Sequence, residues 1–224
     1  MLSSDSNYFK KQKNVISRSS QSVFQSLSAL KSNQDYLCCI VGIFSQQFAF
    51  ACLIVSLSLY LQSAQSLTAL HASYVLFPMT ILFAIASIVA GKWIDNSGVR
   101  GTSLFGLVSM TVMVFSCAFL SAKTSLVIVV GLMPLIGITT GIAFAALNSG
   151  LVKLVAPSLV GTGSSLFTML ALAGNFIGAT LTVFLYEVNG IAAVMIMGGI
   201  ILLGAVIYYW LMSSSDNSMV ELGS

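Results

Sequence analysis

The stretch Gly91-Lys92-Trp93-Ile94-Asp95-Asn96-Ser97-Gly98-Val99-Arg100-Gly101 decides how the rest of the chain is interpreted. It is a charged, glycine-marked island between two long apolar runs, and the last ionised side chain before Lys92 is Asp35. A charged side chain inside a bilayer costs roughly 2.5 to 3.5 kcal/mol on insertion scales, so charge returns where a chain leaves the lipid. The pattern therefore predicts a tight loop at a membrane surface.

The composition supports a membrane setting for the whole chain. Of the 224 residues 57% are hydrophobic and only 7% are charged, whereas a soluble domain carries about 25% charged residues. A surface with so little polar coverage must mostly face lipid. The formal net charge of +3 is too small to indicate a nucleic-acid partner.

Six apolar segments without ionised residues follow a polar, basic N-terminal segment over 1–36. Each is close to the roughly 20 residues that a helix needs to cross a bilayer, which predicts an all-α integral membrane protein with a transmembrane domain over 37–212 and a short polar tail over 213–224. The predicted spans are 37–61, 72–91, 102–120, 125–148, 162–186 and 191–211. Residues 20–32 fit either a short amphipathic helix on the membrane surface or a disordered tail.

Lysine and arginine predict the orientation of these spans, because cytoplasmic loops carry an excess of both. With six spans, one side of the membrane has Lys10, Lys11, Lys13, Arg18, Lys31, Lys92, Arg100 and Lys153, and the other has only Lys123. The first side is therefore predicted to be cytoplasmic. Both termini then lie in the cytoplasm of a multi-pass protein of the cell's inner (plasma) membrane.

Two kinds of residue inside the spans are candidates for special roles. Small residues at four-residue spacing let helices approach closely, and they are Gly137, Gly141, Gly174 and Gly178. Amides at membrane depth need partners or a cavity, and they are Gln46, Gln47, Asn148 and Asn175. These amides fit either hydrogen bonds between helices or contacts with a substrate.

The chain offers little for catalysis or metal binding. Its four cysteines lie in apolar runs without a C-x-x-C pair, and no sequence cluster predicts a metal ion or another cofactor. A serine nucleophile needs a base within reach, yet Ser164 and His71 are predicted at opposite membrane surfaces. The sequence therefore does not indicate an enzyme.

The spacing G-x-x-x-D-x-x-G-x-R, formed by Gly91, Asp95, Gly98 and Arg100 between two spans, resembles the signature loop of the major facilitator superfamily. Leu59-Tyr60-Leu61-Gln62 and then Pro78 look like the start of the C-terminal half of its drug-efflux members. The run 156–165, leading to Gly174-Asn175-Phe176-Ile177-Gly178, is similar to their eleventh span. The resemblance covers about residues 35–212.

This resemblance implies half of a facilitator fold, in which two inverted three-helix repeats supply six spans and the first, second, fourth and fifth border a central cavity. It implies secondary active export of a drug or another small organic solute by antiport, with a separate N-terminal half or a second copy as partner. It also implies that Asp95 latches one conformation, although Asn96 and Val99 stand where basic residues are usual. The alternative is a truncated membrane protein or interaction subunit that does not transport.

Overall fold

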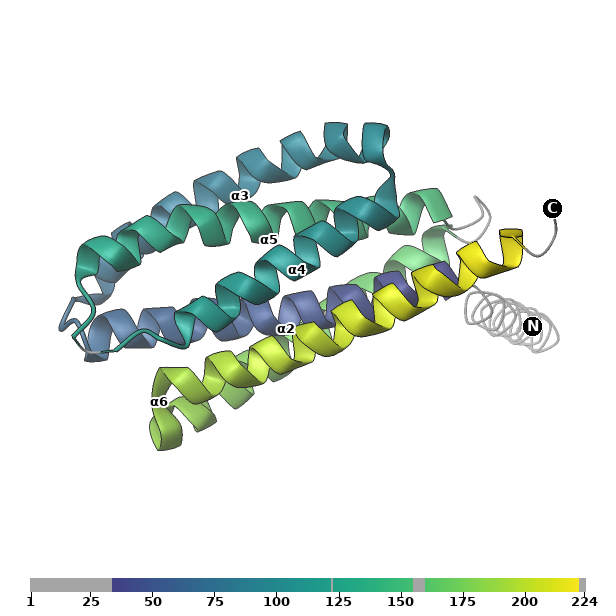
Figure 1. Cartoon of the computed structure of the whole chain (residues 1–224). Helices are drawn as coiled ribbons and strands as arrows, with labels where there is room; N and C mark the ends of the chain where they lie inside the picture. Colours follow the sequence, from purple (N-terminus) through teal and green to yellow (C-terminus); the bar gives the residue numbers. More distant parts are fainter. Residues whose placement is uncertain (1–33, 122, 155–159, 222–224) are drawn as a thin grey trace, which may run out of the picture.

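The computed structural model describes residues 34–121, 123–154 and 160–221, and it is helical almost throughout. Its helices run side by side as an elongated bundle (Figure 1). They are α2 Gln34–Ser63, α3 Ala69–Ser97, α4 Val99–Cys117, α5 Leu126–Leu154 and α6 Val160–Glu221. The predicted amphipathic helix over 20–32 lies outside the described residues.

Helix α6 consists of two helical segments that meet at Gly190, where the backbone is not helical (φ 70°, ψ −170°). Glycine has no Cβ and adopts this positive φ without a steric penalty. In Figure 1 the chain reverses there, at the lower left, and the second segment returns beside the first. The two predicted spans 162–186 and 191–211 thus fall within this one folded-back element.

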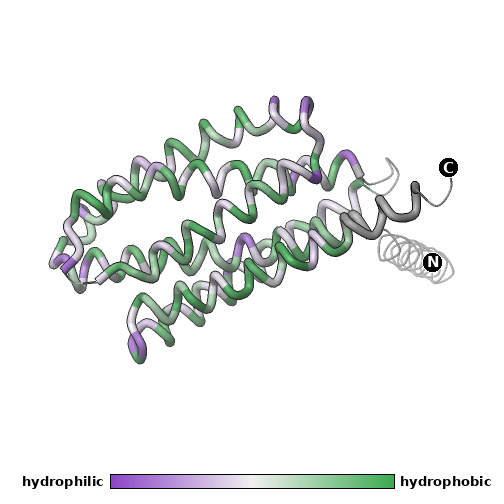
Figure 2. Tube along the Cα trace, in the orientation of Figure 1, coloured by the Kyte–Doolittle hydropathy of each residue, from purple (hydrophilic) through white to green (hydrophobic). Residues whose placement is uncertain are grey.

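All five helices are long and apolar enough to cross a membrane. Polar residues gather toward the ends of the bundle, and apolar residues follow the helices between them (Figure 2). The chain is therefore a multi-pass, all-helical membrane protein. The turn between α3 and α4 lies at one end of the bundle, which is named the Gly98 end. The reversal within α6 lies at the other end, which is named the Gly190 end.

The predicted loop over 91–101 is much shorter in the structure, where it is reduced to one residue. Helix α3 continues through Ser97, α4 starts at Val99, and only Gly98 between them is non-helical (φ 80°, ψ 164°). The prediction ended the second span at Gly91 because charge returns there. A helix need not end where the lipid ends, since charged residues past that point are solvated while its backbone hydrogen bonds continue.

Four glycines hold two helix pairs together at backbone contact. A Cβ built on Gly137 or Gly141 of α5 would lie 2.3 Å from the Met79 carbonyl oxygen or 2.5 Å from that of Phe83, both in α3. Cβ atoms built on two glycines of α6, Gly174 and Gly178, would each lie 2.5 Å from a carbonyl oxygen of α2. Only glycine permits such an approach. The result is an α3–α5 pair and an α2–α6 pair.

Helices α2 and α3 differ in how deeply they are buried. In the most apolar 18-residue window, 61% of α2 is buried in the bundle but only 17% of α3. The outer stripe of α3 is apolar at helical spacing, and its exposed residues include Leu70, Tyr74, Phe77, Ile81, Ile85 and Ile88. Helix α2 is therefore central, and α3 presents a broad face to the surroundings of the bundle.

Candidate functional site

The adjacent glutamines of α2 occupy different environments. Gln46 is completely buried, and neither its amide oxygen nor its amide nitrogen has a hydrogen-bond partner among the described residues. Gln47 is half-buried and lines two open cavities on the surface of the bundle. Neighbouring residues on an α-helix point about 100° apart, so one glutamine faces the core while the next faces a cavity.

The first cavity has a volume of about 320 Å³ and opens between α2, α3 and α5. Its lining residues are Gln47, Phe50, Ile54, Met79, Thr80, Phe83 and Phe144. The Phe83 ring connects the three helices, because its centroid lies 6.1 Å from that of Phe50 and 5.6 Å from that of Phe144. The cavity thus combines an aromatic wall with the amide of Gln47 and the hydroxyl of Thr80.

The second cavity, of about 180 Å³, opens between α2, α5 and the first segment of α6. Its lining residues are Gln47, Phe144, Asn148, Phe167, Thr168, Ala171 and Leu172. The side-chain amide of Asn148 donates a hydrogen bond to the Phe144 carbonyl oxygen (2.8 Å), which leaves its own oxygen able to accept one. Because both cavities share Gln47 and Phe144, they form one continuous surface, named the Gln47 face.

The structure thus brings together Gln47 and Asn148 of the four candidate amides. Gln46 lies in the core, and Asn175 lies one helical turn beyond Ala171 and is not among the residues that line either cavity. Thr80 and Thr168 also line the Gln47 face, although sequence reasoning did not select them. A threonine hydroxyl can bond to its own helix, as that of Thr168 does to the Ser164 carbonyl oxygen (2.8 Å), so the sequence gives no signal for it.

The Gly98 end of the bundle carries an ion pair between two helices. Lys153 Nζ, in the last turn of α5, lies 2.7 Å from Asp95 Oδ1, near the end of α3. Both side chains are well exposed, at 48% and 70%, and such surface pairs contribute only about 0 to 1 kcal/mol to stability. The pair therefore links the ends of α3 and α5 but contributes little to the stability of the fold.

The remaining members of the signature spacing lie in and beside the turn between α3 and α4. Gly91 lies in the helical end of α3, Gly98 is the turn, and Arg100 lies in the first turn of α4. A Cβ built on Gly91 or Gly98 would meet no atom within 4 Å, so close packing does not require glycine at either position. Gly98 does have a positive φ, which favours glycine for conformational reasons.

Metal chemistry has no support in the described part of the chain. No group of three or more histidine, cysteine, aspartate or glutamate side chains occurs there that could hold an ion. His71 instead takes part in the start of α3, where the Thr68 side chain accepts a hydrogen bond from its backbone nitrogen (3.4 Å) and lies 2.7 Å from its Nδ1. This is an ordinary helix cap.

Replacing Gln46 with leucine should stabilise the protein. A buried polar group without a partner costs about 1 to 3 kcal/mol, and leucine has a similar size without that cost. We expect the free energy of unfolding in detergent to rise by about that amount. Gln47→Leu is the matched control, since its side chain is already accessible and little change is expected. A loss of stability in Gln46→Leu would contradict the structure at this position.

The long apolar helices form one bundle, and four of its helical segments line a polar and aromatic face with two cavities. These features place the chain in the class of polytopic membrane proteins. Residues 39–221 match the Major Facilitator Superfamily, so the chain belongs to this family of membrane transporters, which are not enzymes.

Two individual proteins illustrate this relationship. The chain is 29% identical over 157 residues to the uncharacterized MFS-type transporter YwoD of Bacillus subtilis (strain 168). These aligned residues are 69% of this chain and 34% of the relative. The fold is similar to that of the POT family transporter PepTSo in its in meso crystal structure, with a TM-score of 0.69 and 18% identity over 81% of this chain and 38% of that one. The chain spans little more than a third of the length of either protein.

Proposed function

We propose that the chain forms half of a secondary active transporter of the efflux type, and that the Gln47 face is one wall of its substrate pathway. The observation that carries this proposal is the origin of the lining residues: they come from α2, α3, α5 and the first segment of α6, and none comes from α4 or the second segment of α6. These are the elements that border the cavity in the facilitator arrangement. In this proposal the two segments of α6 count as separate spans, giving two three-helix repeats.

The chemistry of the Gln47 face suggests the class of substrate. Three neighbouring phenylalanine rings provide an apolar aromatic surface, and the amides of Gln47 and Asn148 with the hydroxyl of Thr80 provide a few hydrogen-bonding groups. Apolar pockets with a few placed polar groups suit small organic molecules. A small aromatic or amphipathic solute, including drug-like cations, fits this description, and antiport would drive its export.

A partner is part of the proposal because the Gln47 face is open on one side. A separately encoded N-terminal half or a second copy of the chain would supply the opposite wall. In the proposed orientation the Gly98 end is cytoplasmic and both termini lie on that side. A truncated, non-transporting protein is the second candidate, and the replacement of two usually basic positions by Asn96 and Val99 favours it.

The direct test measures ethidium accumulation in bacteria that lack their own drug pumps. Cells would express the chain alone, or together with any six-span half encoded immediately upstream. We expect lower accumulation when the functional pair is present, and loss of the difference after an uncoupler collapses the proton gradient. Purified chain that remains strictly monomeric in nanodiscs would contradict the homodimer, and unchanged accumulation in every combination would favour the non-transporting alternative.

Removing the charge at Asp95 should impair transport without affecting membrane insertion. In the proposed latch the carboxylate must hold Lys153 so that the ends of α3 and α5 move together. Asp95→Asn removes the charge attraction but costs at most about 1 kcal/mol, because the pair is exposed. We expect slower ethidium export at a normal amount of protein in the membrane.

The reversed pair Asp95→Lys with Lys153→Asp is the control for this latch. It restores an ion pair of opposite polarity and should recover part of the lost rate, whereas each reversal alone should not. Equal export by Asp95→Asn and the parent protein would exclude the latch role.

A further inference from the structure

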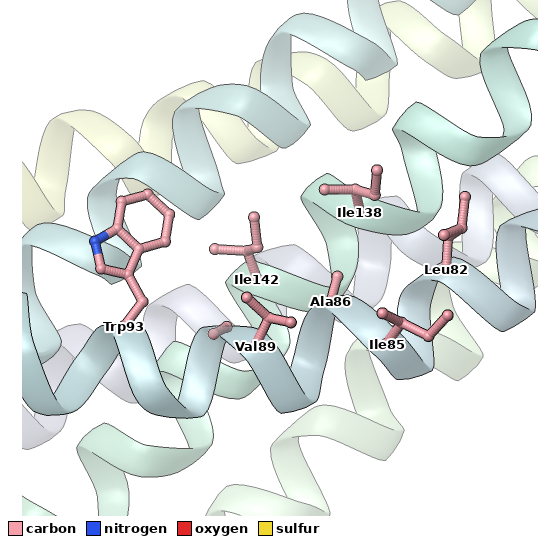
Figure 3. Close-up of a pocket in the computed structure, with 8 residues that line it drawn as sticks. Leu82, Ile85, Ala86, Val89, Trp93, Ile138 and Ile142 are labelled. Atoms are coloured by element: carbon pink, nitrogen blue, oxygen red, sulfur yellow. The ribbon is translucent and has the colours of Figure 1, made fainter.

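A separate groove lies between α3 and α5, outside the Gln47 face. It has a volume of about 300 Å³, and Figure 3 shows its lining side chains along the two helices. They are Leu82, Ile85, Ala86, Val89, Ala90, Trp93, Ile138 and Ile142. Apart from the indole nitrogen of Trp93, this lining consists of hydrocarbon.

The depth of the groove follows from the sequence of α3. Ala86 and Ala90 are buried and four residues apart, so two short methyl groups form the floor where larger side chains would fill the space. Gly141 brings α5 against this floor, with its built Cβ only 3.1 Å from Ala86 Cβ. From Leu82 to Trp93 the helix rises roughly 16 Å, which gives the groove the long, narrow form of an alkyl chain.

The end of the groove near Gly98 is polar and positively charged. In Figure 3 the Trp93 ring closes this end, and its indole nitrogen points away from the hydrocarbon lining. The Phe105 ring holds it edge-on, with 5.0 Å between ring centroids. Tryptophan takes this orientation at the headgroup level of a bilayer.

Charge complementarity at this end favours an anionic ligand. Lys92 is the neighbour of Trp93 in the sequence, it is exposed, and it has no ion-pair partner among the described residues. The Asp95 carboxylate is already paired with Lys153. At this end of the groove Lys92 is thus a basic side chain whose charge no described acidic side chain offsets.

We propose that this groove is a binding site for an anionic phospholipid. One acyl chain lies along Ala86 and Ala90, and the phosphate-bearing headgroup lies beside Lys92 and the indole N–H of Trp93. Neither the groove nor Lys92 belongs to the Gln47 face, so this proposal does not depend on what the protein transports.

The two tryptophans of the chain make a fluorescence test direct. Trp210→Phe leaves Trp93 as the sole tryptophan, and phospholipids with brominated acyl chains quench a tryptophan they contact. The full chain is reconstituted in phosphatidylcholine vesicles that contain a small fraction of brominated phosphatidylglycerol or brominated phosphatidylcholine. We expect the relative association constant to be about fivefold higher for phosphatidylglycerol, the effect of one basic residue near a membrane surface.

Three further variants separate the groove from the general lipid shell. Lys92→Gln should remove the preference for phosphatidylglycerol. Val89→Phe fills the groove and should reduce quenching by both brominated lipids, whereas Ile88→Phe should not, because Ile88 is 71% exposed on α3 but does not line the groove. Ile138→Phe fills the groove from α5 and replaces Val89→Phe if that variant unfolds.

Two results would overturn the proposal. The first is equal quenching by the two brominated lipids in the Trp210→Phe protein, which would mean that the headgroup is not recognised. The second is a preference that depends on Lys92 but is unaffected by either groove-filling variant. That result would assign the effect to surface charge without an acyl-chain site.

Discussion

Gly137→Ala is expected to destabilise the bundle by about 1 to 3 kcal/mol, the usual range for overpacking. The added Cβ would lie 2.3 Å from the Met79 carbonyl oxygen, and this neighbour is backbone, which cannot rotate away as a side chain can. Helices α3 and α5 must therefore separate, and the double variant Gly137→Ala, Gly141→Ala should lose more than either single variant. Thermal unfolding in mild detergent measures the change.

Gly204→Ala in α6 is the matched control for this prediction. A Cβ at Gly204 would meet no atom within 4 Å, and the residue is exposed on its helix. Alanine also has the higher helix propensity, so this variant should be neutral or slightly more stable. Similar losses in Gly137→Ala and Gly204→Ala would show that the α3–α5 contact is not as close as the structure has it.

A cysteine at position 47 is expected to react with a charged, water-soluble thiol reagent on the order of tenfold or more faster than a cysteine at position 46. The reactive species is the thiolate, which forms in water but not in a dry core or in lipid. Gln47 lines both cavities of the proposed pathway, whereas Gln46 is fully buried. Labelling in membrane vesicles, followed by a shift in mass, measures the two rates.

The natural cysteines make this labelling experiment clean, because Cys38, Cys39, Cys52 and Cys117 are all buried. Ile85→Cys provides the second control, since Ile85 is exposed on the outer face of α3, where lipid is expected. Rapid labelling at position 47 but not at 46 or 85 would support a water-filled Gln47 face. Slow labelling at all three positions would mean that lipid, and not an aqueous pathway, covers this face.

The sequence was sufficient to predict an all-helical membrane protein, because long apolar runs without charge can be read directly from the order of the residues. The family was predicted separately, from the resemblance of the Gly91, Asp95, Gly98 and Arg100 spacing to its signature loop. The sequence was less successful at helix ends. A loop was predicted over 91–101, yet these residues are helical except at Gly98, because one glycine costs a helix only about 1 kcal/mol and solvated charges do not break it.

The candidate site was harder to predict because it depends on contacts between distant segments. Gln46 and Gln47 are chemically identical, and only the packing of α4, α5 and α6 around α2 distinguishes a core position from a cavity position. Lys153 was assigned to the same side of the membrane as Asp95 by counting charges, but 58 residues separate them and no sequence pattern indicates their ion pair. The orientation itself remains a prediction.

The glycine contacts described above have a mechanical consequence. They join α3 to α5 and α2 to α6 at backbone distance, so each pair should move as a rigid unit. Both cavities of the Gln47 face are lined by residues from both units, so they lie along the seam between them. A small sliding motion of one unit against the other would widen one cavity and narrow the other while leaving the four glycine contacts within the pairs intact.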